Sequence, residues 1–141
     1  GERDLPLLTA VCLEDGRQRH PNDGARDLSP AASRTLLRMD SRVRLIITHA
    51  DRECVEPVHF GSTPGDASRI LWDISWIWGP PEDHLDQLVT AVGAERFSFG
   101  TGMPLRLPET SVAKLDLAGF DAQARSAIES GNIDEWAGTS T

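Results

Sequence analysis

The sequence predicts an α/β fold built around a parallel β-sheet. Four short segments are rich in β-branched and other apolar residues and resemble buried strands. Segments with helical spacing and helix-capping residues lie between them, and this alternation is typical of parallel strands joined by right-handed crossovers. Such strands belong either to a small doubly wound sheet or to half of an eight-stranded α/β barrel, and periodicity does not choose between the two.

The first half of the chain is predicted to hold two strands and a helix. Residues 5–13 (LPLLTAVCL) are mostly apolar and are bounded by charged residues, as in a buried strand. A polar loop follows, and then Ser29 and Pro30 form the expected start of a helix, as N-cap and first helical residue. Residues 43–50 (VRLIITHA) form the second predicted strand.

The second half repeats the same alternation. Residues 69–76 (RILWDISW) form the third predicted strand. A helix over residues 80–93 starts at prolines, carries acidic residues in its first turn and ends at Gly93. The fourth predicted strand, residues 96–100 (RFSFG), runs into a glycine-rich turn. Two further helices are predicted over residues 108–119 and 121–131.

Composition limits the class of protein. The chain has 141 residues, which suggests a single domain or part of one, and 39% of them are hydrophobic. The net charge of −8 argues against a nucleic-acid partner, and no apolar run approaches the ~20 residues of a membrane span. Because Cys12 and Cys54 each lie beside an apolar segment, we expect reduced, buried thiols in a cytoplasmic protein.

The beginning of the chain suggests either a processed chain or a piece of a longer sequence, and we favour the second. It starts GERDLPLL, without an initiating methionine, and enters an apolar segment within a few residues. We therefore expect residues 1–141 to be a single partial domain. The oligomeric state is not readable from the sequence, and a homo-oligomer is one possibility.

The segment RILWDISWIWGPPEDHLDQLVTAVGAERFSFGTGMPLR, followed by ARSAIESGN, resembles the carboxyl-terminal half of the amidohydrolase-related superfamily of metal-dependent hydrolases. The resemblance spans nearly the whole chain and is strongest over residues 69–132. It implies strands five to eight of a (β/α)8 TIM-like barrel, with parallel strands and outer helices. The amino-terminal half of the barrel would then be a missing partner of this chain.

The resemblance also implies a depleted metal site. In the family, the sixth strand typically ends in a metal-binding histidine, and His49 matches it. The turn after the eighth strand usually supplies an aspartate, but that position falls at or next to Gly102, with no carboxylate nearby. The fifth strand usually ends in a histidine, and residues 9–11 contain none. A zinc-like divalent metal is one possibility in a full-length parent, and tight binding to this chain alone is not expected.

Three residues are candidates for catalysis, all at predicted carboxyl ends of strands. His49 is the candidate acid, base or metal ligand, or alternatively a hydrogen-bonded core histidine. Glu14 and Asp15 lie in EDGRQRH, which is unusually rich in titratable groups for a simple turn. A carboxylate paired with a histidine performs acid/base chemistry, whereas the alternative is a network of loop salt bridges.

Five further residues are candidates for binding a small substrate. Arg17 and His20 belong to the same titratable loop, and Arg106 lies just beyond the glycine-rich turn, where a guanidinium is suited to clamp a carboxylate. Asp73 and Trp76 lie on the third predicted strand, facing either the barrel centre or the helices. The alternatives are solvated loop charges and helix-packing core.

Two classes of function follow from these residues. The first is a hydrolase, or a related lyase, acting on a small organic substrate at the barrel mouth, with weak or no dependence on metal. The second is a non-catalytic, ligand-binding relative that kept the fold and lost the metal. The identity of the substrate is not readable from the sequence.

Overall fold

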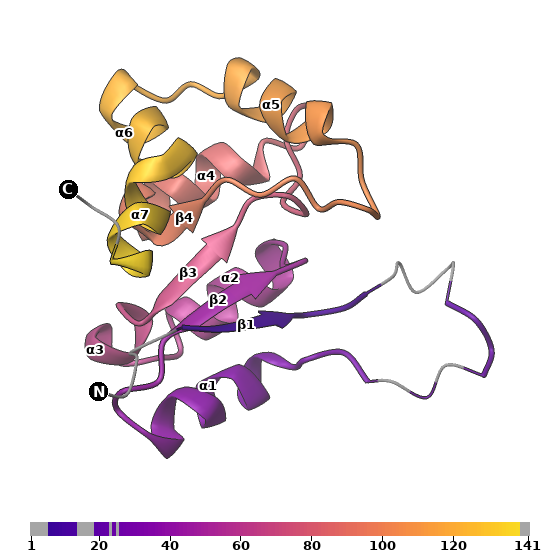
Figure 1. Ribbon diagram of the computed structural model, residues 1–141, viewed down its shortest axis with the longest axis vertical. Helices are drawn as coiled ribbons and strands as arrows, with labels where there is room; N and C mark the ends of the chain where they lie inside the picture. The colour runs from indigo at the N-terminus through magenta and orange to yellow at the C-terminus, as the bar shows by residue number, and fades with distance from the viewer. Residues whose placement is uncertain (1–5, 14–18, 23, 25, 139–141) are drawn as a thin grey trace.

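The chain forms one parallel β-sheet with helices packed against it (Figure 1). The computed structural model describes residues 6–13, 19–22, 24 and 26–138. The sheet has four strands in the order β1-β2-β3-β4, and each strand is parallel to its neighbour. The strands are β1 (Leu7–Ala10), β2 (Leu45–Thr48), β3 (Ile70–Asp73) and β4 (Phe97–Ser98).

Helices follow every strand, as the alternation in the sequence predicts. They are α1 (Pro30–Met39), α2 (Arg52–His59), α3 (Pro64–Ala67), α4 (His84–Val92), the 3-10 turn η1 (Ala94–Arg96), α5 (Pro108–Leu117), α6 (Ala122–Ser126), the π-helical turn η2 (Ala127–Gly131) and α7 (Asn132–Ala137). The α/β class with a parallel sheet is therefore confirmed. A doubly wound sheet reverses its strand order at a switch point, whereas the order of these four strands does not reverse.

The capping residues explain where several helices begin and end. The side chain of Ser29 accepts a hydrogen bond from Ala32 N, and Pro30 occupies the first turn of α1, as predicted. Asp121 caps α6 in the same way through Ala124 N. Gly93, with φ of 104°, ends α4 in a conformation that a side chain rarely adopts.

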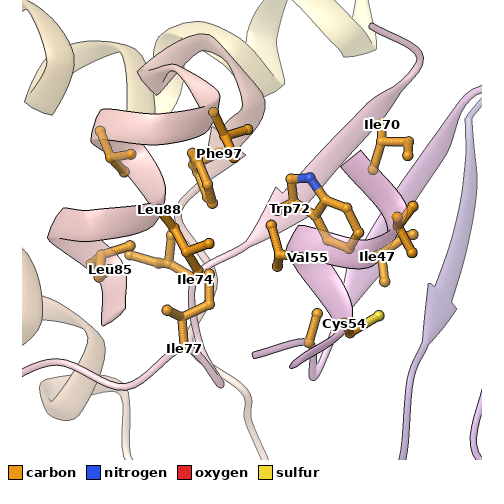
Figure 2. Close-up of a cluster of buried hydrophobic side chains, with 14 of the residues drawn as sticks. Ile47, Cys54, Val55, Ile70, Trp72, Ile74, Ile77, Leu85, Leu88 and Phe97 are labelled. Carbon is orange, nitrogen blue, oxygen red and sulfur yellow. The ribbon is translucent and has the colours of Figure 1, made fainter. Parts of the chain in front are cut away.

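The main core lies between one face of the sheet and the helices. The paired residues Thr9, Ile47, Trp72 and Phe97 share one face, because neighbouring parallel strands keep side chains in register. Figure 2 shows Trp72 and Ile47 beside Val55 of α2 in this core. Its helical members come from α1, α2, α4, α5 and η2, namely Leu37, Cys54, Val55, Val58, Leu85, Leu88, Val89, Val92, Leu115 and Ile128.

The first strand corrects one expectation. Residues 5–13 are predicted as a long buried strand, but β1 is four residues long, and Leu7 and Leu8 are 53% and 70% exposed. β1 lies at the edge of the sheet, where it pairs only with β2 among the described strands. The apolar run predicts the strand correctly, but its burial depends on neighbours that the run itself does not specify.

The carboxyl-terminal helices are anchored to β4 and to the start of β2. Asn132 donates from Nδ2 to Ala94 O and Phe97 O, each at 2.8 Å, and Phe99 N donates to Ile128 O at 2.8 Å. Arg44 lies over the Trp136 ring, with its guanidinium carbon 5.4 Å from the ring centroid. The predicted helix over residues 121–131 is thus two helical turns of different type, continued by α7.

Candidate functional site

The carboxyl ends of β2, β3 and β4 bring together residues from three distant parts of the chain. Because all strands of a parallel sheet point the same way, these ends meet at one edge. β2 delivers His49, and β3 delivers Asp73 and, just beyond it, Trp76. The turn after β4, residues 99–106, leads to Arg106. We call these four residues and the turns that carry them the carboxyl-end site.

His49 adopts an uncommon backbone conformation directly after β2. Its φ of 57° lies in the left-handed region, which is sparsely populated by residues other than glycine. Such conformations persist where the surrounding structure enforces them, and they gather at functional sites. The turn at His49 ends the strand and leads into α2, so the imidazole stays at the sheet edge.

The imidazole of His49 has one hydrogen-bond partner among the described residues, the Thr48 hydroxyl. Nδ1 lies 2.9 Å from Thr48 Oγ1, and the Thr48 hydroxyl in turn donates to Thr9 O at 3.5 Å. A hydroxyl has one proton, so a Thr48 hydroxyl that donates to Thr9 O accepts from Nδ1, and in that tautomer the lone pair lies on Nε2. Nε2 is buried and has no hydrogen-bond partner among the described residues. Burial lowers the pKa of His49, Asp73 opposes this effect and Arg106 adds to it.

Trp76 contacts both His49 and Arg106. The Trp76 and His49 rings meet edge to face, with centroids 4.9 Å apart and an angle of 61° between their planes. The guanidinium carbon of Arg106 lies 4.0 Å from the Trp76 ring centroid, a distance typical of a cation–π contact. The structure records no hydrogen bond from the Arg106 guanidinium to a described residue, so its N–H groups remain available to an anion.

Asp73 is held by its own turn and by a glycine opposite it. Its Oδ1 accepts a hydrogen bond from Ser75 N at 2.7 Å. A Cβ atom placed on Gly100 would lie 1.6 Å from Asp73 Oδ2, so only glycine leaves room for the carboxylate there. The turn that lacks a carboxylate of its own therefore makes space for one from β3.

Gly102 has a different structural role in the same turn. Its φ of 71° favours glycine, and a Cβ there would approach the Cβ atoms of Ser75 and Arg106 at 3.3 Å each. Leu105 N and Arg106 N both donate to Gly102 O, at 2.9 and 3.0 Å. This tight turn places Arg106 beside Trp76.

The described residues do not fit a catalytic metal. Within the ranges that the structure describes, no group of three or more histidine, cysteine, aspartate or glutamate side chains is arranged to hold a metal ion. Catalytic zinc takes about three protein ligands and leaves one position open. His49 is one candidate ligand, and Gly102 brings no side chain to the position where the resemblance implies an aspartate.

Comparison with known proteins does not identify the chain. No protein-family model matches it, and no curated protein matches it. The likeness to the amidohydrolase-related superfamily therefore remains a hypothesis from the sequence. Any assignment of function has to rest on the fold and on the geometry of the carboxyl-end site.

The structure groups some of the predicted site residues and leaves others apart. It brings together His49, Asp73, Trp76 and Arg106. Glu14, Asp15 and Arg17 lie outside the described residues. His20, between β1 and α1 in the chain, is exposed, and its Nδ1 accepts a hydrogen bond from Asn22 N at 3.1 Å.

Sequence reasoning missed a second pair of titratable groups near this edge. Asp51, two residues after His49, lies 3.2 Å from His84 Nδ1 and accepts a hydrogen bond from Trp78 N at 3.4 Å. This pair ties the N-cap residue of α2 to the first residue of α4. The DHL pattern at residues 83–85 resembles an ordinary helix start, so no local signal marked His84 as a partner of Asp51.

The two cysteines also lie closer than their positions in the chain suggest. Burial raises the pKa of the Cys54 thiol to about 11, and the nearby Cys12 contributes to the rise. Cys12 Sγ lies 3.9 Å from His49 O, whereas Cys54 lies on the buried face of α2, in the core. Cys54 is buried as predicted, and Cys12 is half-buried.

Proposed function

We propose that the chain is part of a hydrolase or related lyase that binds a small organic anion at the carboxyl-end site and uses His49 as a general base. The observation that carries this proposal is the buried Nε2 of His49, which has no described partner and lies beside one negative and one positive side chain. Buried polar groups are normally hydrogen-bonded, and exceptions concentrate where a ligand or a catalytic step uses them.

The charges around His49 suit proton transfer. Because burial lowers its pKa, the imidazole is neutral near pH 7 and is able to accept a proton at Nε2. The imidazolium so formed is stabilised by the Asp73 carboxylate, the one neighbour that raises the pKa of His49. Thr48 keeps the ring oriented through Nδ1.

Arg106 and Trp76 suit the binding step. The guanidinium carbon of Arg106 lies over the Trp76 ring, and the N–H groups of a guanidinium match a carboxylate or a similar oxyanion. The indole of Trp76 provides an apolar surface on which the hydrocarbon part of such a molecule packs. A substrate clamped by Arg106 would have its reacting atoms near His49, because both side chains contact the same indole.

The finer fold assignment belongs to the same proposal. We infer that the four strands are strands five to eight of a (β/α)8 barrel, with the missing half adjoining the exposed edge strand β1. The sequential strand order and a core on one face of the sheet support this arrangement. A divalent metal, if the parent enzyme uses one, would take its remaining ligands from outside the described residues.

The second candidate is a ligand-binding relative without turnover. One observation favours it: Trp76 and Arg106 pack beside His49, and Nε2 is not accessible to solvent. A ligand held by Arg106 would then bind without any proton transfer. The two candidates differ in whether His49 is needed for turnover, and they share the anion site.

The test is a screen of small carboxylated esters, amides and 2-oxo acids, followed by NMR for binding and for product. We expect wild-type turnover, a loss of roughly 10²–10⁴-fold in His49→Gln with binding retained, and a raised KM in Arg106→Gln. Arg38→Gln, at an exposed arginine in the last turn of α1, is the matched control for Arg106→Gln and should behave as wild type. Binding without turnover would select the second candidate, and neither binding nor turnover would reject both.

A further inference from the structure

Lys114 makes an unusual set of contacts across the edge of the carboxyl-end site. From α5, its ammonium donates to three backbone carbonyls of the segment that follows β3: Ile74 O and Ser75 O at 2.8 Å each, and Ile77 O at 2.9 Å. An ammonium group has three N–H donors, so these three bonds saturate it. The three carbonyl oxygens form a cradle that is closed by a single positive charge.

The residue type at this position is informative. Lys114 is the only lysine in the chain, and the other thirteen basic residues are all arginine. The planar fork of a guanidinium spreads its donors in one plane, whereas an ammonium directs three donors from one point. Arg69 shows the contrast, because its two terminal nitrogens reach Asp40 O, Val43 O and Leu37 O as separate acceptors. A compact cradle of three converging carbonyls requires lysine.

The segment that Lys114 holds carries part of the carboxyl-end site. Ser75 N binds Asp73, and Trp76 makes the ring contact with His49 and the cation–π contact with Arg106. The three carbonyls belong to residues 74, 75 and 77, so they lie on both sides of Trp76 in the chain. Gly79 gives the lysine stem its path, because a Cβ there would lie 2.8 Å from Lys114 Cγ.

We propose that Lys114 is a positioning residue of the carboxyl-end site, acting as a tethered monovalent cation whose binding to the three carbonyls sets Trp76 against His49. Carbonyl oxygens that converge on one point are the ligands with which proteins replace the hydration shell of a monovalent cation. The effect of Lys114 on turnover rests on the proposed function, whereas its effect on Trp76 and His49 does not.

The proposed role of Lys114 should depend on its protonation state. Burial is the main cause that lowers the pKa of Lys114 to about 8; Arg106 contributes to the shift, and Asp73 and Asp51 oppose it. A neutral amine has two N–H donors and leaves one carbonyl of the cradle without its bond. The position of Trp76 should therefore change as the pH rises through about 8.

Free ammonium provides a direct test. In Lys114→Ala, the cradle is left without its cation, and the pocket of about 300 Å³ that Lys114 and Arg106 both line offers a route to it. We expect the indole N–H resonance of Trp76 and the ring resonances of His49 to move away from their wild-type positions. Ammonium chloride should return them, and tetramethylammonium chloride at the same concentration should not, because it has no N–H donors.

Two further variants keep the test decisive. Lys114→Arg retains the charge with the wrong donor geometry and should show displaced Trp76 and His49 resonances with unchanged far-UV circular dichroism. Gly79→Ala leaves Lys114 in place but obstructs its stem, and should displace the same resonances in part. If Lys114→Ala does not fold, Lys114→Arg and Gly79→Ala decide the question.

Two outcomes would overturn the proposal. One is that the Trp76 and His49 resonances stay at their wild-type positions in Lys114→Ala or Lys114→Arg. The other is that ammonium and tetramethylammonium chloride restore them equally, which would indicate charge screening alone. These spectra are recorded without substrate, so they stand even if the turnover screen fails. Where turnover is found, displacement of Trp76 should lower kcat/KM on the order of 10²-fold, with partial recovery in ammonium.

Discussion

The carboxylate of Asp73 occupies the volume that a side chain on Gly100 would fill. Asp73 ends β3 and Gly100 follows the neighbouring strand β4, and a Cβ on Gly100 would fall 1.6 Å from Asp73 Oδ2. The carboxylate beside His49 thus comes from β3, and it fits there because the residue after β4 is glycine. This relation explains why a turn without any titratable side chain lies at the centre of a charged site.

Gly100→Ala is expected to displace the Asp73 carboxylate and break its bond to Ser75 N. Overpacking of this kind costs about 1–3 kcal/mol, so the free energy of unfolding should fall by that amount. Because Asp73 raises the pKa of His49, its displacement should also lower that pKa. Urea unfolding and an NMR titration of His49 measure the two effects.

Gly65→Ala is the matched control for this substitution. Gly65 lies in α3, and a Cβ there would meet nothing within 4 Å. It should leave the His49 titration unchanged and the stability equal or slightly higher, because alanine favours helix. A Gly100→Ala variant that behaved like Gly65→Ala would show that Asp73 is not held in this position.

The charges beside His49 are expected to act in opposite directions on its pKa. Asp73→Asn keeps an acceptor for Ser75 N but removes the negative charge, so the pKa of His49 should fall. Arg106→Gln removes the positive charge, so the pKa should rise. NMR titration of the His49 ring tests both, and shifts of the same sign in the two variants would contradict the site geometry.

The same two variants predict a change in the pH dependence of turnover. A general base must be deprotonated, so the acidic limb of the kcat/KM profile follows the pKa of His49 in the free enzyme. The limb should move to lower pH in Asp73→Asn and to higher pH in Arg106→Gln. An acidic limb that stayed in place in both variants would assign the base to another residue.

Much of the fold is predictable from the sequence. Strand and helix order follow from local patterns, and the caps at Ser29 and Asp121 depend on residues within one turn. The burial of β1 is not predictable in this way, because it depends on what covers the strand. The third strand is also shorter than its apolar run predicts, since β3 ends at Asp73 and the chain then turns through Ser75.

The carboxyl-end site is only partly predictable, for a related reason. Parallel strands place their ends together, so His49, Asp73 and Arg106 are candidates from their positions alone. The contacts among them depend on residues far apart in the chain, as in the approach of Asp73 to Gly100. Lys114 gives no local signal of its role, because its three acceptors are backbone atoms 37 to 40 residues away.

Asn132 is expected to be required for the attachment of the carboxyl-terminal helices. Its buried amide donates to Ala94 O and Phe97 O, so Asn132→Leu leaves two carbonyls without partners and should cost about 1–3 kcal/mol. Asn132→Asp should cost more at pH 7, because a carboxylate would face the same two oxygens.

The pH dependence of Asn132→Asp gives a sharper test. Two carbonyl oxygens and burial raise the pKa of the introduced carboxyl in the folded state, so the folded chain binds the proton more tightly than the unfolded chain does. Stability should therefore recover as the pH falls through that raised pKa. Asn22→Asp, at the other asparagine of the chain, which is exposed, should show no such recovery of stability in urea unfolding between pH 7 and pH 5.

Cys54 is expected to react slowly with alkylating reagents in the folded protein. Only the thiolate is nucleophilic, and with a pKa of about 11 roughly one Cys54 side chain in 10³ is ionised at pH 8. An ordinary thiol has a pKa near 8.5, so unfolding in urea should raise the alkylation rate on the order of 10²-fold.

Cys12→Ser isolates Cys54 for this measurement by iodoacetamide labelling and mass spectrometry. The variant also removes the contribution of Cys12 to the raised pKa of Cys54, so Cys54 should react somewhat faster than in wild type. In wild type, peptide mass spectrometry distinguishes labelling at Cys54 from labelling at Cys12. Equal alkylation rates of Cys54 in the folded and unfolded states of Cys12→Ser would mean that this side chain is not buried.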